Sequence, residues 1–150
     1  CNLASINVAK VHTRKEINAV FPTVMRILDN VITLNYYPIK EAEMTAMKYR
    51  SVGLGYLGLA EYLAVNHLAY DSIEAREKVD ELFSEYAYAT YRASIDIAKE
   101  RGHYPLFEGS EYSQGKLLGK KKDWFVKNTK RGEDWKKLFA DMKQYVWLRN

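Results

Sequence analysis

Three glycines, Gly53, Gly55 and Gly58, have the spacing G-x-G-x-x-G, which in dinucleotide-binding folds brings a phosphate to a helix N-terminus. That chemistry needs a buried strand before the first glycine and an acidic residue about 20 positions later. The preceding residues, AEMTAMKYRSV, are instead typical of a helix, and the acidic residues near the expected position, Asp71 and Glu74, are better explained as helix caps. We expect Gly55 and Gly58 on one side of a helix, where missing side chains let another backbone approach.

The histidines and tyrosines give weaker indications of chemistry. Glu100-Arg-Gly-His103 has the E-x-x-H form of di-iron carboxylate proteins. Because Gly102 is expected to end the helix between the two ligands, and no second copy of the motif exists, we predict no metal site. The twelve tyrosines, among them Tyr86, Tyr88 and Tyr91, are interpreted as core or surface-covering residues rather than redox groups.

Cys1 is the one cysteine of the chain, which excludes an internal disulfide and suits a cytoplasmic protein. A free cysteine is most often a small buried hydrophobic residue, and the residues alone lead no further. Because the first residue is not Met, we interpret the chain as processed, excised or cut from something longer. A split gene, a database fragment and an intein junction, which requires a nucleophile such as cysteine at this position, all fit.

Composition indicates a globular protein with a mildly basic surface. The apolar content is 47% and the net charge is +4, with much of the excess between Lys116 and Lys137. We interpret these lysines as a solvated face, and a phosphate or nucleic-acid contact stays open as the alternative. No apolar run approaches the roughly 18 residues that span a bilayer, and no signal peptide pattern is present.

The first half of the chain predicts a strand followed by helices. Residues 2–9 alternate between apolar and polar types, as in a short strand. Thr13-Arg-Lys-Glu16 has the form of a capping box, and an apolar helical stripe follows it from Ile17 to Val31. Pro22 is expected to kink or break this helix. Residues 41–50 and 57–65 are the next two helices that the pattern predicts.

The second half predicts the longest helix and a terminal one. Asp71-Ser-Ile-Glu74 resembles a capping box at the start of the long helix, and Gly102 is placed to end it. The expected buried face consists of Val79, Leu82, Phe83, Tyr86, Thr90, Ala93 and Ile97. Residues 103–132 lack a periodic pattern and predict an ordered, irregular loop. The last amphipathic helix is expected to bury Trp135, Leu138, Phe139 and Met142.

The fold class is therefore mainly α, with one N-terminal strand plus about five helices. A single strand cannot satisfy its own edges, so the pattern looks incomplete.

Several segments resemble, in order and spacing, the large catalytic subunit of class I ribonucleotide reductases. They are CNLASIN, NYYPIKEAE, RSVGLGYLGLAEYLA, AKERGHYPLFEGSEYSQG, EDWKKL and the terminal LRN. The likeness covers essentially all 150 residues, and CNLAS joined to NYYP is among its most specific parts. The sequence is identified as a member of this family. Residues 1–150 are then a partial barrel domain, incomplete at both ends.

The resemblance implies a ribonucleoside-diphosphate reductase, which makes deoxyribonucleotides for DNA replication by thiyl-radical chemistry. It implies a fragment of a ten-stranded α/β barrel, in which a finger loop carries the radical-forming cysteine. Two further cysteines reduce the ribose 2′ position and end as a disulfide. Cys1 corresponds to one of them, and its partner lies outside this chain. Leu3 would face the same side of the strand, and we hypothesise that it lines the ribose pocket.

The resemblance also implies the partners of the whole enzyme. These are the remainder of the large subunit, a small radical-generating subunit that contains metal, thioredoxin or glutaredoxin, the ribonucleoside diphosphate substrate and the allosteric effectors ATP and dATP. We expect no cofactor or metal in this segment, no phosphate role for its glycines, a cytoplasmic location, no membrane and no activity of the segment alone. A non-catalytic structural segment and a small basic nucleic-acid-binding module remain as alternatives.

Overall fold

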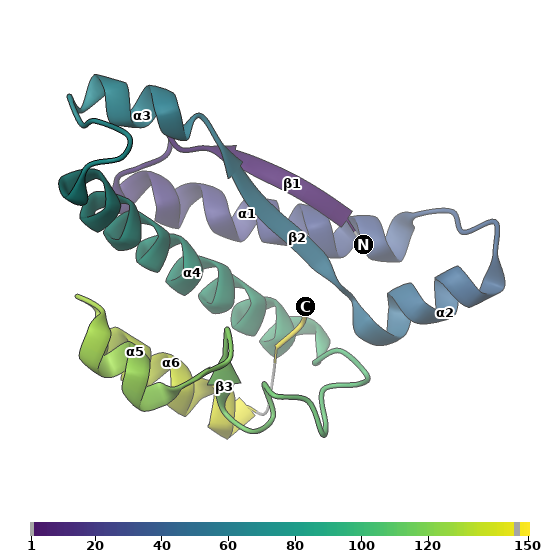
Figure 1. The fold of residues 1–150 in the computed structure, drawn as a ribbon. Coiled ribbons are helices and arrows are strands. Elements are labelled where there is room, and N and C mark those ends of the chain that lie inside the picture. Colours follow the sequence, from purple (N-terminus) through teal and green to yellow (C-terminus); the bar gives the residue numbers. More distant parts are fainter. Residues whose placement is uncertain (1, 146–147) are drawn as a thin grey trace.

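The computed structural model describes residues 2–145 and 148–150 (Figure 1). The first half contains β1 (Asn2–Asn7), α1 (Arg14–Leu34), α2 (Lys40–Tyr49), β2 (Val52–Leu57) and α3 (Leu59–Val65). The second half contains α4 (Ile73–Arg101), β3 (Lys116–Leu117), β4 (Lys120–Lys121), α5 (Lys122–Asn128) and α6 (Gly132–Tyr145). The expected predominance of helix is confirmed, and the described residues also form two short strand pairs.

Helix ends follow from local side-chain chemistry. The Thr13 hydroxyl accepts a hydrogen bond from the Glu16 amide, and the Glu16 carboxylate accepts one from the Thr13 amide, so the predicted capping box of α1 is confirmed. At α4 the cap is Ser72, one residue later than expected, and its hydroxyl accepts from the Ala75 amide at 3.0 Å. Gly102 ends α4 with a φ of 81°, a backbone conformation that favours glycine.

Pro22 does not break α1, which continues through it for more than three turns. Proline removes the hydrogen bond to the carbonyl four residues earlier, here that of Asn18. Both residues are exposed, so water can bind this carbonyl. The neighbouring Phe21 and Met25 are fully buried, and their packing holds the helix together on its other side. The far end of the predicted apolar stripe is less buried than expected, because Val31 is exposed.

The glycine stretch is a strand, which corrects the expected helix over this region. Residues 52–57 form β2, and β2 pairs with β1 in parallel along its whole length. The chain enters β2 through Arg50, whose φ of 48° ends α2 in the left-handed conformation. The sequence pattern did not predict this strand, because its partner lies about 50 residues earlier and a local pattern does not indicate such a distant pairing. Only α3, which starts at Leu59, is helical here.

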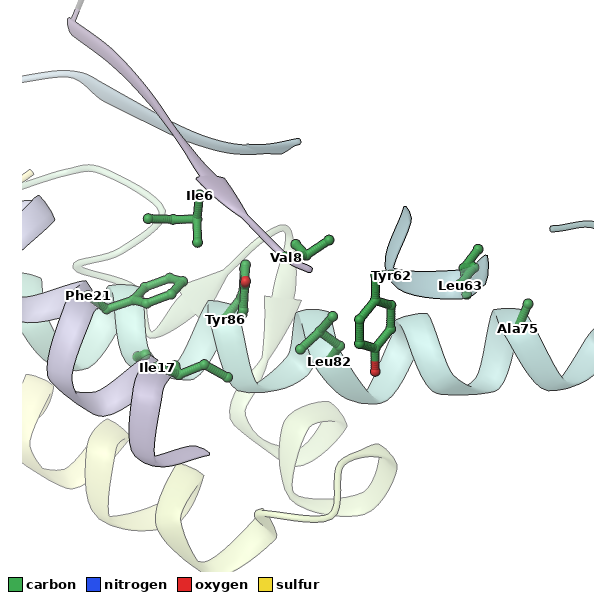
Figure 2. Close-up of a cluster of buried hydrophobic side chains, with 10 residues drawn as sticks. Ile6, Val8, Ile17, Phe21, Tyr62, Leu63, Ala75, Leu82 and Tyr86 are labelled. Carbon is green, nitrogen blue, oxygen red and sulfur yellow. The ribbon is translucent and has the colours of Figure 1, made fainter. Parts of the chain in front are cut away.

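The main core lies between the strand pair and two long helices. Ile6 from β1, Phe21 from α1 and Tyr86 from α4 point toward one another (Figure 2). The rings of Phe21 and Tyr86 pack edge to face, with 4.6 Å between their centroids. A second cluster, Met25, Leu28, Ala93 and Ile97, continues the contact between α1 and α4. One face of the strand pair is therefore covered by helices.

The C-terminal part has its own core on the other side of α4. Trp135 and Leu138 of α6 are fully buried, and they pack with Phe125 of α5 and Ile95 of α4. The predicted buried face of the last helix is confirmed. The irregular loop expected over residues 103–132 is irregular only up to residue 115, where Tyr104 and Phe107 join this core. After it come β3, β4 and α5, which corrects the rest of that prediction. Lys120 belongs to the two-residue strand β4, which pairs with β3.

Within the part of the chain that the structure describes, α1 alone has the length and mean hydropathy of a membrane-spanning helix. The core helix of a globular protein meets the same criterion. Here the buried side of α1 packs on β1 and α4.

Candidate functional site

The face of the strand pair that points away from the helices is open. Leu3 is 80% exposed, and Ser5 beside it is exposed as well. Opposite them on β2 lie Gly53 and Gly55, which add no side chain to this face. A Cβ atom at Gly53 would lie 2.6 Å from Cδ2 of Leu3, so the Leu3 side chain rests directly over this glycine. The result is an open floor formed by Leu3, Ser5 and the two glycines.

Gly58, at the end of the strand pair, allows a positive φ and a close approach to Asn7. Its φ is +77°, and a Cβ atom there would lie 2.5 Å from Oδ1 of Asn7. The same oxygen accepts a hydrogen bond from the Ala9 amide at 3.0 Å. The glycines thus serve close packing, as expected, but their nearest neighbours are side chains of β1 rather than another backbone.

The opposite face of β1 points toward α1 and α4. Ala4 and Ile6 face the core, and Asn2 donates a hydrogen bond from Nδ2 to the Leu28 carbonyl oxygen at 3.1 Å. Cys1, the candidate redox residue, precedes Asn2 in the sequence and lies outside the described residues. Its role stays a prediction, as does the hypothesis that Leu3 lines the ribose pocket.

A buried polar cluster, which sequence reasoning missed, lies beside the start of β1. Asp29 of α1 is fully buried. Its carboxylate accepts hydrogen bonds from Arg50, from Arg101 at 2.8 Å and from Arg149 at 3.0 Å. Burial works to raise the pKa of the Asp29 carboxyl, but Arg50, Arg149 and Arg101 outweigh it and hold the pKa below its ordinary value. An aspartate within an apolar helical stripe was the signal that could have revealed this cluster.

The same cluster holds the last residues of the chain next to the start of β2. Asn150 donates from Nδ2 to the Arg50 carbonyl and to the Asp29 carboxylate, each at 3.2 Å. The Ser94 hydroxyl accepts from the amides of Arg149 and Asn150, both at 3.1 Å. Two strand starts and the C-terminal residues therefore meet at one turn of α1.

A cavity of about 620 Å³ opens next to this region. It lies where the end of α1, the NYYP connector and α2 surround Asn2. Polar groups from Asn35, Glu41, Thr45 and Ser51 line it together with apolar side chains. The start of β1 is thus accessible from one side.

The other candidates from the sequence have structural partners. Glu100 forms a bidentate ion pair with Arg26, with distances of 2.6 and 2.7 Å, and Nδ1 of His103 lies 2.7 Å from the Tyr104 carbonyl oxygen. Among the described residues no group of three or more His, Cys, Asp or Glu side chains could hold a metal ion. The Tyr86 hydroxyl donates a hydrogen bond to the Val11 carbonyl. Burial raises the pKa of Tyr86 to about 12.

Several lysines of the basic segment are paired with carboxylates. Lys130 lies 2.8 Å from Glu81, and Lys136 lies 2.5 Å from Glu133. Such pairing is typical of a solvated surface and leaves less free positive charge for a nucleic acid.

A parallel strand pair joined by a helical crossover, with helices on one face, is a unit of an α/β fold. The whole chain, residues 1–150, matches the family model described as ribonucleotide reductase, barrel domain. The chain therefore belongs to the ribonucleotide reductase barrel-domain family.

Curated relatives agree with this family. The ribonucleoside-diphosphate reductase subunit alpha of Helicobacter pylori is 44% identical over 115 residues, which is 77% of this chain and 15% of that protein. The alpha subunit of a Synechocystis species is 38% identical over 146 residues, 97% of this chain and 18% of that protein. The large chain of Neurospora crassa is 35% identical over 152 residues, 97% of this chain and 16% of that protein. The chain thus spans less than a fifth of the length of these relatives.

Proposed function

We propose that this chain is part of the catalytic subunit of a ribonucleoside-diphosphate reductase, and that Cys1 is one of the two thiols that reduce the substrate. The observation that carries the proposal is the family match over residues 1–150, together with the names of the relatives. The geometry of the described residues is compatible with it. Cys1 directly precedes β1 in the sequence, and β1 pairs with β2 along its whole length and carries the exposed Leu3.

The proposed chemistry is a two-electron reduction of the ribose 2′ carbon. A thiyl radical elsewhere in the subunit activates the ribose, and the 2′ hydroxyl leaves as water. Two thiols supply the two electrons and are joined in a disulfide. A second thiol on a neighbouring strand must then lie within a Cα separation of roughly 4.4 to 6.8 Å. An external dithiol such as thioredoxin or glutaredoxin restores both thiols by exchange.

Residues 1–150 form part of a barrel in this proposal, and the rest of the machinery lies in the remainder of the large subunit. That remainder supplies the radical cysteine, the partner thiol, the substrate-phosphate loop and the sites for ATP and dATP. A metal-containing small subunit generates the radical, and the assembled enzyme works in the cytoplasm. The segment needs no cofactor of its own.

Complementation tests this proposal. The 150-residue chain alone, with small subunit and dithiol present, is expected to show no turnover, because the radical and half of the dithiol are missing. Co-expression with the remainder of the subunit should restore multiple turnovers, and Cys1→Ser should abolish them. Equal turnover with Cys1 and Ser at this position would reject the catalytic role and favour a structural segment whose chemistry has decayed.

A further inference from the structure

One turn of α1, formed by Leu28 and Asp29, contacts the beginnings of both strands. The Leu28 carbonyl accepts the hydrogen bond from Asn2 at the start of β1, at 3.1 Å. The adjacent Asp29 binds Arg50, which stands two residues before β2. Figure 1 shows the start of β1 lying against α1, with β2 alongside. We name this pair of residues the Leu28–Asp29 turn.

On the β2 side of this turn, Arg50 is buried and held by several hydrogen bonds. Arg50 is only 4% exposed, and besides the Asp29 carboxylate it donates to the Asp29 carbonyl at 2.9 Å and to the Thr33 hydroxyl at 3.0 Å. These bonds fix the position at which β2 begins. Val52 is the β2 partner of Asn2. The hydrogen bonds of Arg50 therefore also help to set the register between Asn2 and β2.

Asn2 departs from the pattern of its strand. It occupies the inward-facing set with Ala4 and Ile6, where an apolar or β-branched residue would serve stability better, because asparagine is depleted in strands. A polar side chain at an inward-facing position departs from the usual pattern of a strand, and such departures are expected at functional sites. The amide of Asn2 ties the strand to a helix turn that Arg50 already immobilises. That is a positional constraint which an apolar side chain cannot supply.

We propose that Asn2 is a positioning residue for the thiol of Cys1, with the Leu28–Asp29 turn as its anchor. The inference rests on the proposed function. Asn2 follows Cys1 directly in the sequence, so the hydrogen bond of its side chain restrains the residue next to the one that carries the thiol. A thiol that must meet both a ribose and a second thiol tolerates little displacement, since a shift of about 1 Å can cost on the order of a hundredfold in rate.

The test compares Asn2→Ala with Asn66→Ala in the full-length subunit, assayed with its small subunit and a dithiol reductant. Asn66 is a matched control, because its Nδ2 also donates to a helix carbonyl, that of Tyr62 at 2.8 Å, and it lies in another part of the fold. We expect Asn2→Ala to lower kcat by about tenfold to a hundredfold. The two variants should have the same KM for the ribonucleoside diphosphate and the same thermal unfolding temperature.

Two results would overturn the inference. The first is a kcat for Asn2→Ala equal to that of Asn66→Ala. The second is a kcat that falls only together with a rise in KM and a loss of thermal stability, which indicates a structural role. Cys1→Ser, assayed beside them, separates this failure from failure of the proposed function. If Cys1→Ser is inactive while Asn2→Ala is normal, only the positioning role is rejected, whereas an active Cys1→Ser rejects both.

Discussion

At the scale of single residues, the most informative position is Asp29. It carries one buried negative charge, and three arginines bind it: Arg50 after the end of α2, Arg101 of α4 and Arg149 near the C-terminus. Much of the positive charge is satisfied by backbone oxygens as well: Arg149, for example, donates to the carbonyls of Arg101 and Gly102 at 3.2 Å. All three arginines bind the Asp29 carboxylate, so its loss should leave this group of cations with much less compensation.

Asp29→Asn is therefore expected to lower the free energy of unfolding by about 3–5 kcal/mol, the usual result of removing one partner of a buried pair. The measurement is urea unfolding at neutral pH. Glu100→Gln is the control, because Glu100 pairs with Arg26 on the exposed surface and its removal should have little effect. Equal destabilisation by both variants would contradict the central role of Asp29.

The pH dependence of the folding stability is an independent test of the role of Asp29. Because the pKa of Asp29 is lowered in the folded state, the folded chain binds fewer protons than the unfolded chain near the ordinary aspartate pKa of about 4. The contribution of Asp29 is thus present above that pKa and is lost as the pH falls through the lower folded value. Wild-type stability should fall more steeply on acidification than that of Asp29→Asn.

At the scale of elements, the sequence predicts what is local and misses what is distant. The capping box of Thr13 and the glycine end of α4 depend on neighbouring residues, and both predictions were confirmed. β2 depends on β1, and the Asp29 cluster joins residues up to 121 positions apart. No periodicity within a short window contains such contacts. The open floor beside Leu3 likewise exists only because β2 lies next to β1.

The junction at the end of β2 gives an element-scale prediction. Gly58→Ala combines a positive φ with a Cβ atom 2.5 Å from Oδ1 of Asn7, so it should destabilise the chain by about 1–3 kcal/mol from strain alone and by more from the contact. Gly109→Ala is the matched control, because Gly109 has a φ of +82° and nothing within 4 Å of its Cβ position. In thermal unfolding, the midpoint temperature of Gly58→Ala should be clearly lower than that of Gly109→Ala. The reverse order would show that Asn7 does not constrain this junction.

At the scale of the whole molecule, the described residues form helical scaffold on one side of a strand pair and leave the other side open. The helices bury Ile6 and its neighbours, while Leu3 on the outer face stays 80% exposed. In the proposed enzyme, this outer face meets the interior of the barrel. Family membership was predictable from CNLAS and NYYP, but the support of the strand by the Leu28–Asp29 turn became visible only in three dimensions.

The central claim, that Cys1 is half of the substrate-reducing pair, is tested most directly by trapping its oxidation state. Fully reduced full-length enzyme is mixed with small subunit, effector and ribonucleoside diphosphate in the absence of external dithiol, then alkylated and digested for mass spectrometry. We predict that deoxyribonucleotide forms together with a disulfide that contains Cys1. Product formed while Cys1 remains fully alkylated as a free thiol would contradict it.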